Sequence, residues 1–347
     1  MRRGNLWTAL VGFVAAGVVF AALFWVVGVE DVLAALARAS LPLVGLVAAA
    51  IVAWLLAWGL ALRYVLAALG VDLPTFDAVL VTAATAFISH VMPFGQASSE
   101  PVTAWLLTDI SETEFETGLA AIASLDALNF VPSLSFAIVG VGYYATAVAL
   151  SDGLAVLVGG VVVVAIGLPL LAALAWRRRV GLQRRLVNLL TPLIRRISGV
   201  LPGDPLEPDE IATRIGSFVE AVERVAGDRR RVAAALAFSA AGWACQSLGL
   251  WVALLAVGAS VPVYVPLFVV PIGTTASIVP TPGGLGGIET VNITLLMLVT
   301  SASPTIATAA VTIHSVGGFF LTNSLGAAAA ATIRVQGASI TGRLTQR

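Results

Sequence analysis

The chain has 347 residues, of which 59% are hydrophobic and 11% are charged, and its mean hydropathy is +0.99. Soluble globular domains carry about 25% charged residues, so the composition excludes that class and predicts a membrane protein. The formal net charge is zero, and the single cysteine, Cys245, excludes an internal disulfide or a cysteine metal cluster. We expect no bound metal, no cofactor and no nucleic-acid partner.

Long apolar runs without charged residues predict about eight membrane-spanning helices, because crossing the hydrocarbon core takes about 20 helical residues. Helices are expected because lipid offers no partners to free backbone groups, and the alternating pattern of barrel strands does not occur. The first run, with about 26 uncharged residues, exceeds the apolar core of a signal peptide and is interpreted as a retained span. The predicted spans cover residues 6–28, 41–62, 75–92, 117–147, 154–176, 232–257, 261–279 and 305–333.

The spans are expected to form a single integral membrane domain over residues 1–347, composed of two halves and the segments between and around them. The other predicted elements are a short amphipathic segment over 29–39, short helices over 101–108 and 289–300, each after a break in the apolar pattern, and a helix near 208–225. The expected parts are a first repeat half over about 41–147, an extra helix over 151–176, a cytoplasmic loop over 177–231 and a second repeat half over about 232–336.

The cations predict the orientation in the membrane. All 19 of them are arginines, and twelve fall in the loop 177–231, while five more lie at the two termini. Short arginine-rich loops stay cytoplasmic. The pattern therefore predicts a multi-pass protein of the cell (cytoplasmic) membrane with both termini inside, and only Arg38 lies on the outer side.

Two helix breaks have similar sequences. Residues 93–102 and 282–291 share Pro, Gly, Glu and Val at matching positions, 189 residues apart. The same offset places the spans of one half on those of the other, and the predicted orientation gives the halves opposite directions. A Pro/Gly-interrupted segment at the same place in two inverted repeats is typical of a transporter site near the bilayer midplane. The predicted fold is an all-α polytopic bundle with two broken, re-entrant elements in an inverted repeat.

The candidate substrate-binding residues are those of the two breaks and two polar residues on one face of the span 117–147. A helix that restarts after a break presents free N–H groups and a positive dipole end, which suit a phosphate or carboxylate. The alternative is a pair of tight turns with nothing bound. The candidates are Pro93, Gly95, Ser98, Ser99, Glu100, Asp126, Asn129, Pro282, Gly283, Gly284, Gly286, Gly287 and Glu289.

Glu100 and Glu289 are the sharpest candidates, because an ionised carboxylate at membrane depth costs about 3 kcal/mol or more. Each is interpreted as a proton carrier, an ion ligand or an acceptor for a headgroup hydroxyl or amine. The alternative is a helix N-cap, and both roles can hold together. Asp126 is equally well explained by a hydrogen bond between helices. His90 and His314 are expected to be packing or hydrogen-bonding residues.

These breaks resemble the signatures of the flippase-like transmembrane family, also called the lysylphosphatidylglycerol synthase transmembrane region. Residues 282–289 are similar to its second signature, and residues 100–107 to its first, a Gly-Gly-Glu-Pro followed by Arg and a Leu pair. Ser98 and Ser99 replace the usual glycines, and Thr103 stands where an arginine is common. If that arginine contacts phosphate, this chain uses another cation or a different substrate.

The resemblance implies a lipid-translocating or lipid-handling protein. We expect flippase-like movement of an anionic or glycosylated lipid, with a phospholipid or polyprenyl-linked headgroup. The chain is not expected to be an enzyme. Because it has no nucleotide-binding motif, we do not expect this chain by itself to drive transport with ATP. The alternatives are a secondary transporter for a small anionic or polyol solute and a non-transporting partner of a glycosyltransferase. A homo-oligomer is a further expectation left open.

Overall fold

The computed structural model describes residues 27–91, 95–111, 113–147, 208–278, 281 and 284–344, with isolated positions between 159 and 178. Most of the expected span 154–176, nearly all of the span 6–28 and most of the loop's first half therefore lie outside the described residues. The regular elements of the described part are all helices, in the order α2 (Val29–Ala37), α3 (Leu41–Ala68), α4 (Thr75–Val91), α5 (Gly95–Ser111), α6 (Phe115–Ala147), α9 (Pro208–Gly227), α10 (Arg229–Ala256), α11 (Tyr264–Thr274), η1 (Thr275–Ile278), α12 (Gly287–Val299), α13 (Pro304–Val311), η3 (Thr312–Val316) and α14 (Gly317–Leu344).

Four stretches of helix in the described part are long and apolar enough to cross a membrane. They are Leu41–Ala68, Phe115–Thr146, Arg229–Ala256 and Pro304–Ile333. Three shorter apolar helices, Thr75–Val91, Tyr264–Ser277 and Gly287–Val299, accompany them. The protein is thus an all-helical, multi-pass membrane protein, as the hydropathy pattern predicts. The count of eight spans stays a prediction.

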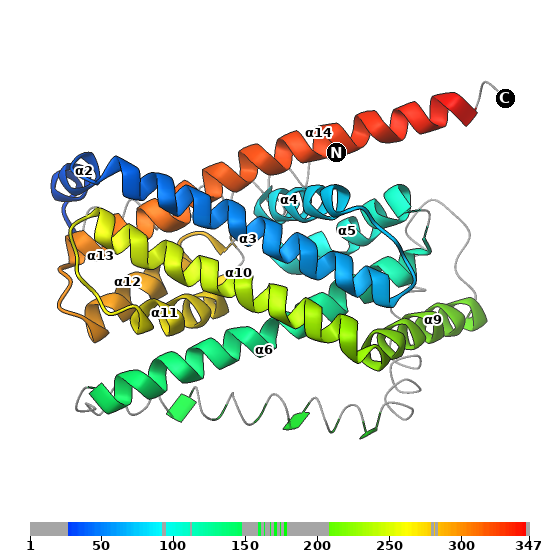
Figure 1. The fold of residues 1–347 in the computed structure, drawn as a ribbon, viewed down its shortest axis with the longest axis horizontal. Coiled ribbons are helices and arrows are strands. Elements are labelled where there is room, and N and C mark those ends of the chain that lie inside the picture. Colours follow the sequence, from blue (N-terminus) through cyan, green and yellow to red (C-terminus); the bar gives the residue numbers. More distant parts are fainter. Residues whose placement is uncertain are drawn as a thin grey trace.

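Helices α3 and α10 lie side by side along most of their length and form the centre of the bundle (Figure 1). Tyr64 of α3 stacks on Phe238 of α10 with ring centroids 5.5 Å apart. Near mid-length, the indole of Trp58 lies directly against Gly242, where any Cβ would collide with it. The missing side chain at Gly242 therefore lets a bulky ring fit between the two helices.

Glycines allow the other helices to approach closely as well. A Cβ at Gly59 of α3 would lie 2.8 Å from Cα of Val79 on α4, and one at Gly118 of α6 would lie 2.9 Å from the Ala104 carbonyl of α5. In lipid the hydrophobic effect does not drive helices together, so tight packing through small residues supplies much of the association energy. Glycine at these contacts is therefore what the fold needs.

The buried apolar residues form two clusters, one towards each end of the α3–α10 pair. One joins the last part of α3 and the first part of α6 to α4, α5 and α9, and includes Leu66 and Leu107. The other joins the last part of α10 to α11, α12 and α13, and includes Leu254 and Phe268. Each cluster thus surrounds one of the two broken elements.

The first break differs in position from the expectation. The helix after it was predicted to begin at Pro101, but α5 begins at Gly95, so Glu100 lies inside the helix and not at its N-terminus. Hydrogen bonds to α4 hold this turn in place: the hydroxyls of Ser89 and Ser99 are 2.6 Å apart, and Thr103 donates to Thr85 at 3.1 Å. These contacts between helices outweigh the preference of proline for a first helical position.

The second break lies between η1, a 3-10 turn, and the start of α12 at Gly287. Gly284 and Gly286 have φ angles of +69° and +89°, which residues with a side chain rarely adopt. The glycine run therefore forms the turn between two helices and sets the direction of the second. This break lies close to the position that the sequence predicts. The stretch expected as the last span is continuous helix from Pro304 onwards, but five residues of it, Thr312–Val316, are π-helical.

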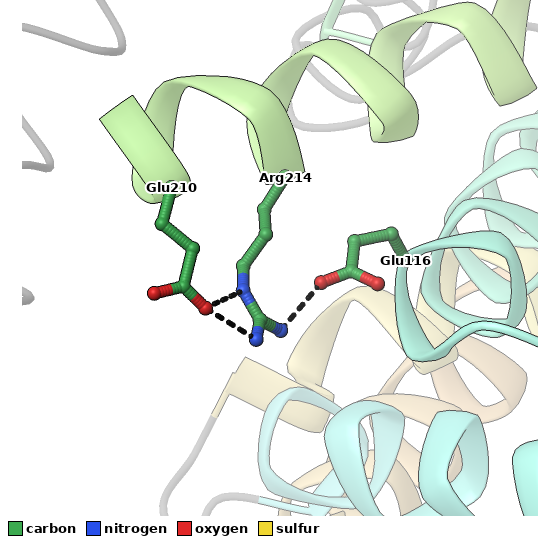
Figure 2. Close-up of polar contacts among 3 residues, drawn as sticks. All are labelled: Glu116, Glu210 and Arg214. Atoms are coloured by element: carbon green, nitrogen blue, oxygen red, sulfur yellow. Dashed lines mark hydrogen bonds and ion pairs between the residues drawn. The ribbon is translucent and has the colours of Figure 1, made fainter. Parts of the chain in front are cut away.

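Helix α9 packs on α6 at the arginine-rich end of the bundle. Figure 2 shows Arg214 between two acids, donating to Glu116 at 2.8 Å and to Glu210 at 2.9 Å. These hydrogen bonds raise the pKa of Arg214 above its usual value. Because the arginine side chain is 48% exposed, the pairs contribute at most about 1 kcal/mol. Burial of Ile211 on the apolar face of α9 holds the helix more firmly.

Candidate functional site

A cavity of about 160 Å³ lies in the bundle beside the apolar cluster of α10–α13, which contributes Ile51, Trp243 and Val270 to its lining. Residues of α3, α4, α10, α11, α12, η3 and α14, with Leu285 of the second break, surround it. The lining residues are Ile51, Trp54, Trp58, His90, Trp243, Gln246, Val270, Thr274, Leu285, Ile288, Glu289, Asn292, His314, Ser315, Gly318, Phe319 and Thr322.

The cavity lies at the mid-length of three candidate spans. Trp54 is at the middle of α3, Trp243 at the middle of α10, and Gly318 at the middle of Pro304–Ile333. Each of these spans is long enough to cross the hydrocarbon core, so we expect the cavity to lie near the bilayer midplane. Polar side chains at that depth are expensive and typically mark a functional site.

Glu289 links the cavity to the start of α12. It is the third residue of the helix, and its Oε2 accepts a hydrogen bond from the Gly286 N–H at 2.6 Å. The side chain is 2% exposed, so this bond and the positive end of the helix dipole stabilise a carboxylate away from water. The N-cap role that the sequence allows for Glu289 is therefore present, and its side chain also lines the cavity.

The hydrogen bonds of His314 fix the position of its proton. Nε2 lies 3.1 Å from the Gln246 carbonyl, which can only accept, so a neutral imidazole carries its proton on Nε2. Nδ1 is then an acceptor, and it is buried with no hydrogen-bond partner among the described residues. The residue sits in the π-helical segment η3, a helix type often found at functional sites.

His90 forms its hydrogen bond through the other ring nitrogen, Nδ1. The Nδ2 group of Asn323 donates to the Phe319 carbonyl at 2.7 Å, which fixes the orientation of the amide, and it lies 3.2 Å from Nδ1 of His90. Nδ1 of His90 therefore accepts, and the proton of the neutral ring is on Nε2. The two histidines contribute an N–H donor and a nitrogen acceptor to the lining of one cavity.

Three tryptophans form an aromatic wall on α3 and α10. Trp54 and Trp58 meet edge to face with centroids 5.1 Å apart, and Trp58 meets Trp243 at 6.0 Å. The indole N–H of Trp243 donates to the Asn129 carbonyl at 3.1 Å. Those of Trp54 and Trp58 are buried without a partner in the part of the chain that the structure describes.

The structure groups the other predicted acid differently. The carboxyl group of Glu100 pairs with that of Asp126 on α6. Asn129, one turn further along α6, accepts a hydrogen bond from Ser239 of α10. These three predicted residues do not line the cavity, although Asn129 reaches it through the bond from Trp243.

The described site residues thus fall into two groups. Glu289 lines the cavity, and Gly284, Gly286 and Gly287 shape the break beside it. Gly95 and Ser98 belong to the first turn of α5, Ser99 to its contact with α4. Pro93, Pro282 and Gly283 lie outside the described residues.

Sequence reasoning missed much of the lining, above all the three tryptophans, Gln246, Asn292 and Thr322. His90 and His314, which the sequence predicts to be packing or hydrogen-bonding residues, do form hydrogen bonds, and both also line the cavity. One signal was present: Trp54 and Trp243 are separated by 189 residues, as Glu100 and Glu289 are.

Comparisons with known proteins cover most of the chain. A family model described as the lysylphosphatidylglycerol synthase TM region matches residues 10–324, a range that contains both breaks and every lining residue. A curated relative from Methanothermobacter thermautotrophicus, a UPF0104 membrane protein, is 25% identical over 288 residues. That alignment covers 82% of this chain and 82% of the relative.

Because Asn292 packs closely against Gly273, we expect one added methyl group at Gly273 to lower the stability of the protein. A Cβ at Gly273 of α11 would collide with the Asn292 side chain, so we expect Gly273→Ala to lower the free energy of unfolding by about 1–3 kcal/mol. Gly142→Ala on α6 is the matched control, because its Cβ would meet nothing within 4 Å. Thermal unfolding of the purified variants measures the difference. Equal melting temperatures would contradict the packing described for Asn292.

Proposed function

We propose that this chain, which belongs to the lysylphosphatidylglycerol synthase transmembrane-region family, translocates a lipid headgroup across the membrane. The headgroup passes through the central cavity while the acyl chains stay in the bilayer. With no nucleotide-binding motif in the sequence, movement follows a gradient or is coupled to another component.

One observation carries this proposal: several polar side chains line a cavity at the mid-length of three candidate spans. A hydroxyl or amide group taken into an apolar medium without a partner costs about 2–7 kcal/mol. Glu289, Asn292 and Gln246 offer such a group hydrogen bonds at the depth where lipid offers none. The cavity therefore lowers the barrier at its highest point.

The pairing of helices supports an inverted repeat. If α3, α4 and α6 correspond to α10, α11 and the α13–α14 stretch, exchanging the halves turns the α4–α14 contact into the α11–α6 contact. Both contacts are extensive, and the α3–α10 contact maps onto itself. Two related halves joined by a twofold axis would give this pattern, with the axis passing near the cavity. The proposed halves are residues 41–147 and 232–336.

The family description favours a lipid substrate, since it refers to the membrane region of synthases that modify a phospholipid. A secondary transporter for a small polyol is the second candidate, because a volume of about 160 Å³ also suits a free solute. A glycosyltransferase partner that transports nothing would have no need of polar groups at this depth. Partners and oligomeric state stay predictions.

The arginine distribution supports a cell-membrane protein with cytoplasmic termini. In a Cys245→Ala background, we expect Ala226→Cys on α9 to resist a membrane-impermeant maleimide in intact cells, because it faces the cytoplasm. Ala37→Cys at the end of α2 should react quickly, and both side chains are exposed. Equal labelling rates would reverse the proposed topology and remove the inverted repeat.

Translocation itself is tested by reconstituting the protein in vesicles with fluorescent lipids and measuring the fraction that becomes accessible to a reducing agent outside. We expect Glu289→Gln to slow translocation about tenfold. The glutamine oxygen still accepts from the Gly286 N–H, but the stronger bond from a charged acceptor to the headgroup is lost, a difference of about 1.4 kcal/mol.

Glu30→Gln is the matched control, since Glu30 is an exposed glutamate in the first turn of α2 and loses the same helix-dipole interaction. It should move lipid at the wild-type rate. Wild-type rates in Glu289→Gln would reduce Glu289 to a helix cap. No acceleration by the wild-type protein with any lipid would reject the proposed function.

A further inference from the structure

Among the described residues, the lining of the central cavity contains no arginine or lysine. Its described lining holds one acid, two histidines with neutral hydrogen-bonding patterns, and no arginine. The sequence contains no lysine, and no arginine occurs between residues 64 and 176 or between 232 and 333. These ranges hold both breaks and all the lining residues except Ile51, Trp54 and Trp58. Nothing there can neutralise a phosphate at mid-depth.

The helix N-terminus that the sequence offers to an anion is already occupied. The carboxylate of Glu289 accepts from the Gly286 N–H and takes the position that a bound phosphate or carboxylate would need. An ionised Glu289, whose side chain is buried from solvent, would repel an anionic headgroup. The structure thus disfavours the anionic substrates that the sequence left open.

Two buried polar atoms without a partner, one acceptor and one donor, belong to residues that line the cavity. Nδ1 of His314 is an acceptor, and the Nε1–H of Trp54 is a donor, and each is buried without a partner among the described residues. An ammonium group only donates hydrogen bonds, and an ionised phosphate only accepts them. A hydroxyl group does both. A ligand with several hydroxyls is therefore the chemistry that satisfies this lining.

The shape of the cavity sets the size of the ligand. A volume of about 160 Å³ corresponds to about five water molecules of liquid. This is room for one sugar ring or a small polyol. The aromatic wall of Trp54, Trp58 and Trp243 offers apolar surface to the C–H groups of such a ligand, beside polar groups that fix its orientation.

We propose that the central cavity binds an uncharged polyhydroxylated group, one sugar ring or polyol in size. The group is the headgroup of a neutral glycolipid or a free solute of the same chemistry. This inference rests on the proposed function for the lipid case and names its substrate class.

The test measures binding independently of transport. The protein is placed in phosphatidylcholine nanodiscs, because a maltoside detergent would compete, and binding of radiolabelled monoglucosyl diacylglycerol is followed by scintillation proximity. The unlabelled competitors are the same glycolipid, phosphatidylglycerol, a dialkyl trimethylammonium lipid and free glucose. We expect the glycolipid to compete at least tenfold better than the two charged lipids.

Two conservative variants locate the binding site. Trp54→Phe keeps an aromatic ring but removes the N–H donor, and His314→Phe removes the acceptor, so each should weaken glycolipid binding about tenfold. Trp105→Phe is the control, since Trp105 is 63% exposed on α5 and does not line the cavity. Size-exclusion chromatography checks that each variant is folded. Unchanged binding in the folded Trp54→Phe variant would overturn the proposal.

The competition assay separates the outcomes. Better competition by free glucose than by the glycolipid supports the ligand chemistry but assigns it to a solute. Best competition by phosphatidylglycerol or by the cationic lipid overturns the proposal. Selective glycolipid binding with no lipid movement in vesicles would leave the ligand class standing and reject translocation. Lipid movement without headgroup selectivity would reject the ligand class alone.

Discussion

A backbone in lipid must find its hydrogen-bond partners inside the protein, and the rest of this structure depends on that constraint. A broken helix leaves N–H groups free at membrane depth. The second break meets the constraint with its own side chain, because the Glu289 carboxylate accepts from the Gly286 N–H while the glycines supply the turn. The same carboxylate lines the cavity, so one residue both stabilises the break and makes the centre of the bundle polar.

The apolar packing around the long α3–α10 pair stabilises a bundle that has polar groups at its centre. An apolar cluster lies towards each end of the pair, and each cluster includes the helices next to one of the two breaks. The polar groups of the cavity lie near the middle of this pair, where the aromatic wall and the two histidines come from different helices. A site at mid-depth with donors and acceptors but no cation suits a ligand that brings hydroxyl groups and no net charge.

Much of the fold was predictable, because the length of an apolar run indicates a membrane span and clustered glycines indicate a turn. The second break lies where the sequence places it, but α5 starts six residues before Pro101, since serine and threonine contacts with α4 outweigh a local proline signal. The site was harder to predict. Trp54, Trp243 and His314 are far apart in the sequence, and a polar or aromatic residue within an apolar helix looks the same whether it faces a cavity or a neighbour. Only the packing of α3, α10 and η3 distinguishes the two cases.

The central claim is that the mid-depth cavity is a water-accessible passage and not a sealed packing defect. Reaction of Ser315→Cys with a small water-soluble thiol reagent, in membrane vesicles and a Cys245→Ala background, tests this most directly, because Ser315 lines the cavity. Phe320→Cys is the control at nearly the same depth, where the native side chain is 66% exposed on the outside of the bundle. The account predicts that Ser315→Cys reacts while Phe320→Cys does not. A Ser315→Cys thiol that stays unreactive until the protein is denatured would contradict it.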